Sequence, residues 1–252
     1  MNRATCHFDH GCEHRRALFE PGLRAAGYHV VPSISNPSKG EVLVIWNRTG
    51  HSHTLAKQFE SAGARVVVVE NGYLGAHWRG EKWIAISLGH HNGAGTWPHG
   101  DADRWDSWGI PLAPWREPGG ECVILAQRGI GEQHLRAPDG WLNDAVRTTR
   151  GRIRRHPGTS KDAVSLEDDL RNASSVATWS SGAAIRALML GVPVFYGMPK
   201  WIGRGCSRPL SAFGAGPLHD DELRLTMFRQ LAWAMWSAAE VQDGTAFKAL
   251  LA

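Results

Sequence analysis

Short runs of apolar residues alternate with helix-length segments along most of the chain. In the first half, the runs EVLVIW (41–46), RVVVVE (65–70) and WIAISL (83–88) predict strands. A helix is predicted within 14–31, ahead of a short strand, and another over 51–63, where it ends on a glycine. Continuous apolar runs separated by helices are typical of a parallel sheet with both faces covered. The pattern therefore predicts an α/β fold.

This rhythm stops over residues 97–120, which are rich in Pro, Gly and Trp, and then restarts. We interpret the segment as an interdomain connection that carries site loops. The elements expected beyond it are strands at 121–126, 151–155, 175–178 and 193–196, and helices at 140–150, 166–172, 182–190 and 220–240. The pattern predicts two Rossmann-like lobes with a cleft between them, and a C-terminal helix that packs back toward the first lobe. The expected boundaries are 1–117 and 118–212 for the two lobes and 213–252 for the helical segment.

Composition and charge exclude few classes of protein. The chain has 252 residues, of which 42% are hydrophobic, and this suits one large domain or two of ordinary size. Its net charge of +4 is compatible with phosphate-bearing partners, although an ordinary surface has the same balance. The four cysteines form no C-x-x-C pair, no leader pattern opens the sequence, and no run reaches the ~20 apolar residues of a membrane span. We expect a reduced, cytoplasmic protein.

The stretch SSVATWSSGAAIRALMLGVPVF (174–195) contains the clearest candidate chemistry. A predicted strand ends at Thr178, and Ser180, Ser181 and Gly182 then open a predicted helix. Ligands of open parallel sheets bind beyond the carboxyl ends of the strands, and a helix N-terminus offers unpaired N–H groups to phosphate. The alternative is that Ser180 or Ser181 only caps the helix.

Two further strand ends of the same lobe favour the phosphate interpretation. Arg154 and His156 lie in RIRRHPG, and Arg128 and Gly129 follow the lobe's first strand in ILAQRGIGEQ. Backbone donors, hydroxyls and positive charge are what a diphosphate or nucleotide requires. We therefore expect a nucleotide-type ligand at this edge of the second lobe.

The segment RRHPG, followed by LEDDLRNASSVATWSSGAAIRALMLGVPVF, resembles the donor lobe of GT-B glycosyltransferases. It is most similar to the bacterial capsule-synthesis, Kdo-transferase-like group, and the whole pattern has the look of a small phage-type variant. The resemblance covers residues 120–200 and departs at Arg186, where many of these enzymes have an acidic residue. It implies a nucleotide-sugar-binding second lobe and an acceptor-side first lobe. It also implies that His156, Ser180 and Ser181 face the donor nucleotide. Together with the other residues at these strand ends, the expected donor-binding set is Arg128, Gly129, Arg154, His156, Thr178, Ser180, Ser181 and Gly182.

Glycosyl transfer needs a base for the acceptor hydroxyl, and in GT-B enzymes the first lobe supplies it. Candidates at strand ends are Asp9 and His10 in HFDHG and Glu70 in VENGY, with the pair His90–His91 next in line. Either carboxylate could instead cap a helix or tie down a turn. The expected acceptor-binding residues are Asn71, Tyr73, His91 and Asn92.

The resemblance implies no metal and no cofactor besides the nucleotide-sugar substrate. A zinc site in CHFDHGCEH is a weaker alternative, because the spacing of Cys6, His7, His10, Cys12 and His14 fits no common structural site. A serine nucleophile is also weak, because WSSGA lacks the G-x-S-x-G pattern.

The acceptor is the more open question. The run RTTRGRIRR (147–155) holds five arginines, and arginine with aromatic residues suits DNA whose target base is flipped out. A hydroxymethylated base in phage-type DNA is slightly favoured over a glycan or capsule acceptor. The competing functions are a non-catalytic nucleotide- or nucleic-acid-binding protein and a sugar-nucleotide epimerase. The expected partners are thus a nucleotide sugar and DNA, with no membrane span; oligomeric state is left open.

Overall fold

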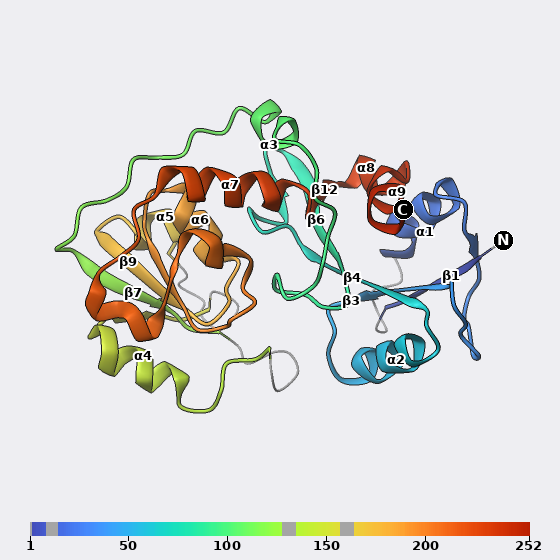
Figure 1. The fold of residues 1–252 in the computed structure, drawn as a ribbon, viewed down its shortest axis with the longest axis horizontal. Coiled ribbons are helices and arrows are strands. Elements are labelled where there is room, and N and C mark those ends of the chain that lie inside the picture. The colour runs from blue at the N-terminus through green and yellow to red at the C-terminus, as the bar shows by residue number, and fades with distance from the viewer. Residues whose placement is uncertain (1, 9–14, 128–134, 157–163) are drawn as a thin grey trace. The chain divides into compact units, whose positions relative to one another are not determined.

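The computed structural model describes residues 2–8, 15–127, 135–156 and 164–252 (Figure 1). The chain divides into two compact units. Unit 1 comprises residues 1–101 together with 231–252, and unit 2 comprises residues 102–230. Both units are α/β, as the hydrophobic pattern predicts; the cleft between two lobes stays a prediction.

Unit 1 is built on a mixed sheet. Its strands are β1 (Arg3–His7), β2 (His29–Val30), β3 (Val42–Trp46), β4 (Arg65–Asn71), β5 (His77–Trp78), β6 (Glu81–Leu88) and β12 (Met235–Ser237). They run in the order β12-β6-β4-β3-β1-β2, and β5 pairs with β6. The strands β2, β1, β3 and β4 are parallel, whereas β6 and β12 are antiparallel to their neighbours.

Helices cover both faces of this sheet. They are α1 (Arg16–Ala25), α2 (Gly50–Ser61), α8 (Ala238–Gln242) and α9 (Thr245–Leu251). Along β3, Val42 and Val44 pack with residues of α1, α8 and α9, while Leu43 and Ile45 pack with residues of α2. In Figure 1 the red C-terminal helices accordingly lie beside the blue α1, and α2 lies on the other side. Burial on both faces explains why β3 and β4 are apolar at consecutive positions.

Gly22 in α1 allows α8 to approach closely. A Cβ atom at this position would lie 1.8 Å from the carbonyl oxygen of Val241, so any side chain would force the helices apart. The C-terminal segment therefore belongs to the core of unit 1 and is not an appendage.

The strand predicted at 83–88 is present, but it does not continue a parallel sheet. β6 runs antiparallel to β4, with Asn71 opposite Ile84 and Val67 opposite Leu88. The connection from β4 spans residues 72–80 and contains only the two-residue strand β5. A parallel crossover needs about a dozen residues or more, usually with a helix. The connection is thus too short, and the all-parallel prediction for the first lobe is wrong here.

The single helix predicted at 220–240 is also wrong. Helix α7 (Asp221–Ala232) ends early, β12 follows and pairs with β6, and α8 then begins after Ser237. Ser237 and Glu240 form a reciprocal capping box, in which each side chain accepts a hydrogen bond from the other residue's backbone N–H. Leu223, in the first turn of α7, is exposed.

Unit 2 contains a fully parallel sheet. Its strands are β7 (Glu121–Leu125), β8 (Arg152–Arg154), β9 (Ala173–Thr178), β10 (Val194–Tyr196) and β11 (Arg208–Pro209), in the order β11-β10-β9-β7-β8. Its α-helices are α3 (Asp103–Ser107), α4 (Trp141–Thr149), α5 (Leu166–Asp169), α6 (Ala183–Met189) and the greater part of α7, with 3₁₀ turns at Ile202–Cys206 and Leu210–Ala215. The carboxyl ends of β7, β8 and β9 meet at one edge, because neighbouring strands are in register at Leu125, Arg154 and Thr178.

Candidate functional site

At the carboxyl edge of the unit 2 sheet, the side chain of Gln127 connects the ends of β7 and β9. Gln127, which follows β7, accepts a hydrogen bond from the Ser180 backbone N–H at 2.8 Å and donates to Ser180 Oγ at 3.2 Å. Ser180 is buried, so this clamp fixes the turn that opens α6. The sequence reasoning did not single out Gln127, although its place directly after a strand is the signal that could have identified it.

Several of the N–H groups expected to cradle phosphate already have partners within the turn. The Ser181 N–H donates to Thr178 Oγ1 at 2.9 Å, and the Ala183 N–H donates to Ser181 Oγ at 3.2 Å. Side chains of the turn thus satisfy these two N–H groups, although the N-cap residue of α6 is Gly182, which makes no side-chain cap hydrogen bond. Its remaining donors are the Ser180 and Ser181 hydroxyl protons and the Gly182 N–H, which contacts no acceptor among the described residues.

Two arginines beside this turn are each paired with a carboxylate. Arg154 at the end of β8 contacts Asp169, with Nε 2.6 Å from Oδ2, and Arg186 on α6 pairs with Glu167 on α5. Burial and, to a lesser degree, the charge of Arg154 lower the pKa of Arg186. His156 lies two residues beyond β8, at the same edge of the sheet. Arg128 and Gly129 lie outside the described residues.

In unit 1, the Glu70 carboxylate near the end of β4 is held on one oxygen only. The Tyr73 hydroxyl donates to Oε1 at 2.8 Å, and the Asn92 N–H donates to the same atom at 2.6 Å. No described residue donates to Oε2. Burial raises the pKa of Glu70 to about 7, against the opposing effect of the two hydrogen bonds. The side chain as a whole remains partly exposed, so the second oxygen is open to a proton donor.

Two other residues expected to bind the acceptor lie around this carboxylate. Tyr73 is buried, and its hydroxyl also accepts the Gly93 N–H at 3.0 Å. Asn92 is partly buried and contributes its backbone N–H rather than its side chain. Asn71, the last residue of β4, is exposed. Asp9 and His10 lie outside the described residues, so Glu70 is the candidate base that the structure allows us to describe.

His91, the fourth expected acceptor residue, is 3% exposed and contacts Arg48 instead of an open surface. Its Nδ1 accepts the Arg48 backbone N–H at 3.0 Å, so its proton resides on Nε2. That N–H has no acceptor among the described residues, which costs about 1–3 kcal/mol for a buried donor. Burial, with a smaller effect from the Arg48 charge, lowers the pKa of His91 to about 4, so the ring is neutral at physiological pH.

Arg48 is a second residue that the sequence reasoning missed. Its side chain is buried, and its guanidinium donates two hydrogen bonds to Glu60, at 2.6 and 2.7 Å, and one to the Gly89 carbonyl at 2.7 Å. A buried arginine needs such partners. Through these hydrogen bonds, Arg48 connects the turn after β3 with helix α2 and with the loop after β6.

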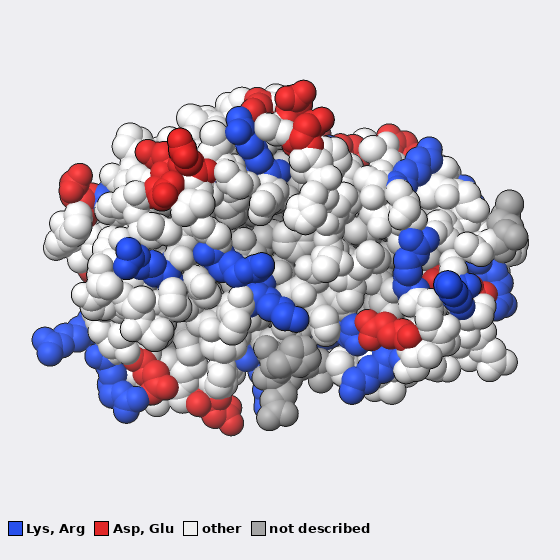
Figure 2. Space-filling view, viewed as in Figure 1, with Lys and Arg blue, Asp and Glu red and all other residues white. Residues whose placement is uncertain are grey.

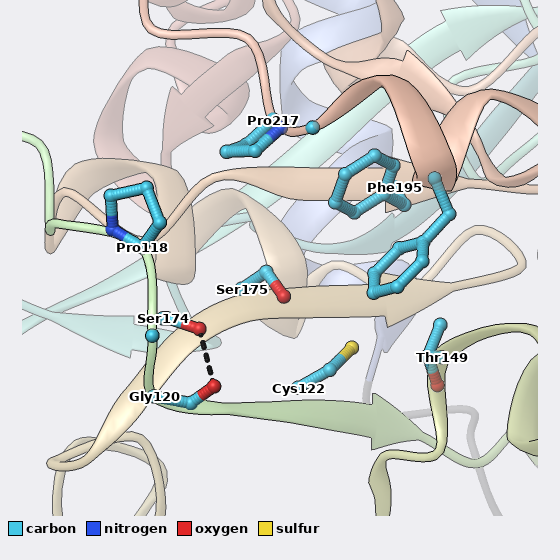
Figure 3. Close-up of a pocket in the computed structure, with 11 residues that line it drawn as sticks. Pro118, Gly120, Cys122, Thr149, Ser174, Ser175, Phe195 and Pro217 are labelled. Atoms are coloured by element: carbon cyan, nitrogen blue, oxygen red, sulfur yellow. Dashed lines mark hydrogen bonds between the residues drawn. The ribbon is translucent and has the colours of Figure 1, made fainter.

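Unit 2 also has a cavity of about 240 Å³, shown in Figure 3. It lies at the amino ends of β7 and β9, where Gly120 and Ser174 are hydrogen-bonded, and is thus at the opposite edge of the sheet from the Gln127–Ser180 turn. Cys122, Thr149, Ser175 and Phe195 are among its lining residues. Burial raises the pKa of Cys122, so this cysteine is not a reactive thiolate.

The described residues include no group of three metal-ligating side chains. Of the alternative zinc ligands, Cys6 and His7 are described, whereas His10, Cys12 and His14 are not. Asp101 and Asp103 have the D-x-D spacing that many metal-dependent glycosyltransferases use, so metal independence stays a prediction. Across the described residues, no helix combines the length and apolar character needed to cross a membrane.

The arginine run at 147–155 is largely neutralised by acidic side chains. Arg147 pairs with Asp144, and Arg152 pairs with Glu121 and Asp169 at 2.9 and 2.7 Å. With Arg154 also paired, only Arg150 and Arg155 of the run have no ion-pair partner among the described residues. On the face drawn in Figure 2, basic and acidic side chains are interspersed. The described surface thus offers DNA less positive charge than the sequence suggests.

The chain has a glycosyltransferase-like fold. Its solved neighbours include KpsC of Thermosulfurimonas dismutans described as a β-Kdo 2,7 transferase, with a TM-score of 0.62 and 13% identity over 98% of this chain and 99% of that one. A second is KpsC of the same organism described as a β-Kdo 2,4 transferase, with a TM-score of 0.58 and 15% identity over 91% and 90% of the two chains. No family model and no curated protein matches the sequence. The predicted resemblance to the Kdo-transferase-like group is thus confirmed for the fold; the phage-type variant stays a prediction.

Proposed function

We propose that this protein is a glycosyltransferase that moves a sugar from a nucleotide sugar to a hydroxyl acceptor, with Glu70 as the base. The observation that carries the proposal is the Glu70 carboxylate. One oxygen is fixed by two donors, the other has no described partner, and burial holds the pKa at about 7. A base whose pKa lies near the operating pH is the most effective proton acceptor in the transition state. The glycosyltransferase-like fold supports the same class of reaction.

The reaction assigns one task to each group. Glu70 Oε2 takes the proton of the acceptor hydroxyl as the acceptor oxygen bonds to the anomeric carbon of the donor. The bond between that carbon and the nucleotide phosphate oxygen breaks, and its electron pair leaves with the phosphate. Preorganised donors and positive charge stabilise the departing anion.

We assign the phosphate to the carboxyl edge of the unit 2 sheet. The hydroxyl protons of Ser180 and Ser181 and the Gly182 N–H are the donors left open there. Arg154, paired with Asp169, and His156 lie at the same edge as further donors, and the Thr178 hydroxyl accepts the Ser181 N–H and so orders the turn. Arg128 and Gly129, which follow β7, complete the proposed donor-binding set. With this set the reaction needs no metal.

We favour a glycan over DNA as the acceptor substrate. Three of the five arginines in the run 147–155 are paired with carboxylates, which removes much of the counterion-releasing charge that DNA binding requires. The two neighbours described as β-Kdo transferases make an activated Kdo the first donor to test. DNA with a hydroxymethylated base remains the alternative acceptor.

The test is a turnover assay with UDP-, GDP- and CMP-sugars, an activated Kdo among them, with and without glycan acceptors and hydroxymethylated DNA. Nucleotide release coupled to a product heavier by one sugar supports the proposal. Binding of a donor without turnover would instead indicate a non-catalytic nucleotide-binding protein. Interconversion of the donor sugar in the absence of acceptor would indicate an epimerase.

A further inference from the structure

The hydrogen bonds on the Glu70 carboxylate depend on one tight turn. In residues 91–94 the Ala94 N–H donates to the His91 carbonyl at 3.1 Å, and the central residues Asn92 and Gly93 have φ of 56° and 73°. Positive φ at both central positions is the requirement of a type I′ turn, and Asn-Gly is the preferred pair for it. The N–H groups of these two residues donate to Glu70 and Tyr73.

This turn is anchored from the opposite side by Arg48. Its backbone N–H donates to His91 Nδ1, and its guanidinium donates to the carbonyl of Gly89, two residues before the turn's first position. The guanidinium is in turn fixed by Glu60. A continuous set of contacts therefore runs from helix α2, through Arg48 and the turn, to the Glu70 carboxylate.

A stabilising role alone does not explain a histidine at this position. Nδ1 satisfies one backbone donor, but Nε2 is a buried N–H without an acceptor among the described residues. An apolar side chain of similar size would avoid that unfavourable group. However, an apolar side chain has no acceptor for the Arg48 backbone N–H, and this hydrogen bond holds the turn.

We propose that His91 is a positioning residue for Glu70: its Nδ1 fixes the 91–94 turn against Arg48, so that the turn presents two backbone N–H groups to Glu70 and Tyr73. The inference rests on the proposed function of Glu70 as the base. In this inference His91 acts on Glu70 indirectly, through the turn. The sequence instead predicted that His91 contacts the acceptor substrate directly.

The experiment compares two variants at His91. His91→Asn places an amide oxygen close to the position of Nδ1 and keeps the acceptor for Arg48, but it lacks the Nε2 proton. His91→Leu keeps an apolar side chain and removes both functions. His29→Leu, on the exposed strand β2, is the matched control for loss of an imidazole elsewhere in unit 1. Circular dichroism and thermal melts establish that each variant is folded.

The first readout is the acidic limb of the pH profile of turnover, which for the parent protein is expected near the pKa of Glu70. Other titratable groups also lie near Glu70 and its turn, among them His90 beside the turn and His53, whose Nδ1 accepts a hydrogen bond from Arg48 Nε at 3.3 Å. Burial raises the pKa of Tyr73 and lowers that of His91 to about 4, so neither group changes charge across this limb. The second readout is the titration of the Glu70 carboxyl by ¹³C NMR in glutamate-labelled protein, assigned by the signal missing from Glu70→Gln. It requires no turnover.

In His91→Leu, we expect both readouts to move by about half a pH unit or more, toward higher pH, because a displaced turn withdraws the Asn92 N–H, whose hydrogen bond to Glu70 lowers the pKa of the carboxyl. His91→Asn and His29→Leu should keep the parental values. Leu and Asn variants that shift alike, or a Leu variant that does not shift, would overturn the inference. If the parent protein has no transferase activity, the proposed function fails, while the NMR titration still decides whether His91 positions Glu70.

Discussion

Replacing the candidate base with its amide should make the protein more stable at high pH. Burial raises the pKa of Glu70 from its ordinary value of 4.5 to about 7, so the folded state binds this proton more tightly than the unfolded state does. The wild-type protein therefore loses stability as the pH rises from 4.5 to 7, and the loss is complete above the folded-state pKa. A shift of this size corresponds to at most about 3.4 kcal/mol.

Glu70→Gln removes this cost, since the amide does not ionise and its oxygen can still accept the hydrogen bonds from Tyr73 and Asn92. We expect the variant to be about 2–3 kcal/mol more stable than the wild type at about pH 8, and the difference to fall to near zero by about pH 4. Equilibrium urea unfolding at several pH values measures this. A variant that is less stable than the wild type by the same amount at every pH would refute the argument that the carboxylate is desolvated.

Glu41→Gln is the matched control with the opposite sign. The hydrogen bond from Arg3 lowers the pKa of Glu41, so its stabilising effect is present above pH 4.5 and is lost as the pH falls through the folded-state pKa. This variant should therefore be destabilised at neutral pH, and the difference should shrink in acid.

Three further predictions concern the site. Tyr73→Phe removes a hydrogen bond that lowers the pKa of Glu70, so the acidic limb of turnover should move to higher pH. Ser181→Ala and His156→Ala should raise the dissociation constant for the nucleotide sugar about tenfold or more, measured by calorimetry, with an unchanged circular dichroism spectrum; unaltered affinity in both would remove these residues from the donor site. Turnover with a glycan acceptor should change little with salt, whereas a steep fall in activity on hydroxymethylated DNA would favour the nucleic-acid alternative.

The sequence predicted much of the fold because buried strands produce an unmistakable pattern. The runs at 41–46, 65–70 and 121–126 each correspond to a strand with apolar side chains on both faces. The sequence-based prediction failed where the hydrophobic pattern does not reveal the direction of a strand. WIAISL has the same composition whether it runs parallel or antiparallel, and only the short connection from β4 decides between them. The helix predicted at 220–240 failed because β12 is too short to interrupt the apolar pattern, although the Ser237–Glu240 capping box marks the new helix.

The candidate site was predictable to the extent that strand ends determine it. Glu70 lies near the end of β4, Tyr73 follows β4 and Asn92 follows β6, and the structure brings Tyr73 and Asn92 within hydrogen-bonding distance of the Glu70 carboxylate. Arg48 and Gln127 were missed because their roles depend on partners 43 and 53 residues away, which no local pattern reveals. The Asn-Gly pair at 92–93 was the one local signal of the turn that holds Glu70.

The most direct test of the central claim is the turnover of Glu70→Gln beside Glu41→Gln, with the nucleotide sugar and acceptor on which the wild-type protein is active. If Glu70 is the base, its amide should lower kcat by ~10²–10⁴ and leave the dissociation constant of the donor nearly unchanged, while Glu41→Gln retains activity. Full turnover by Glu70→Gln would contradict the account.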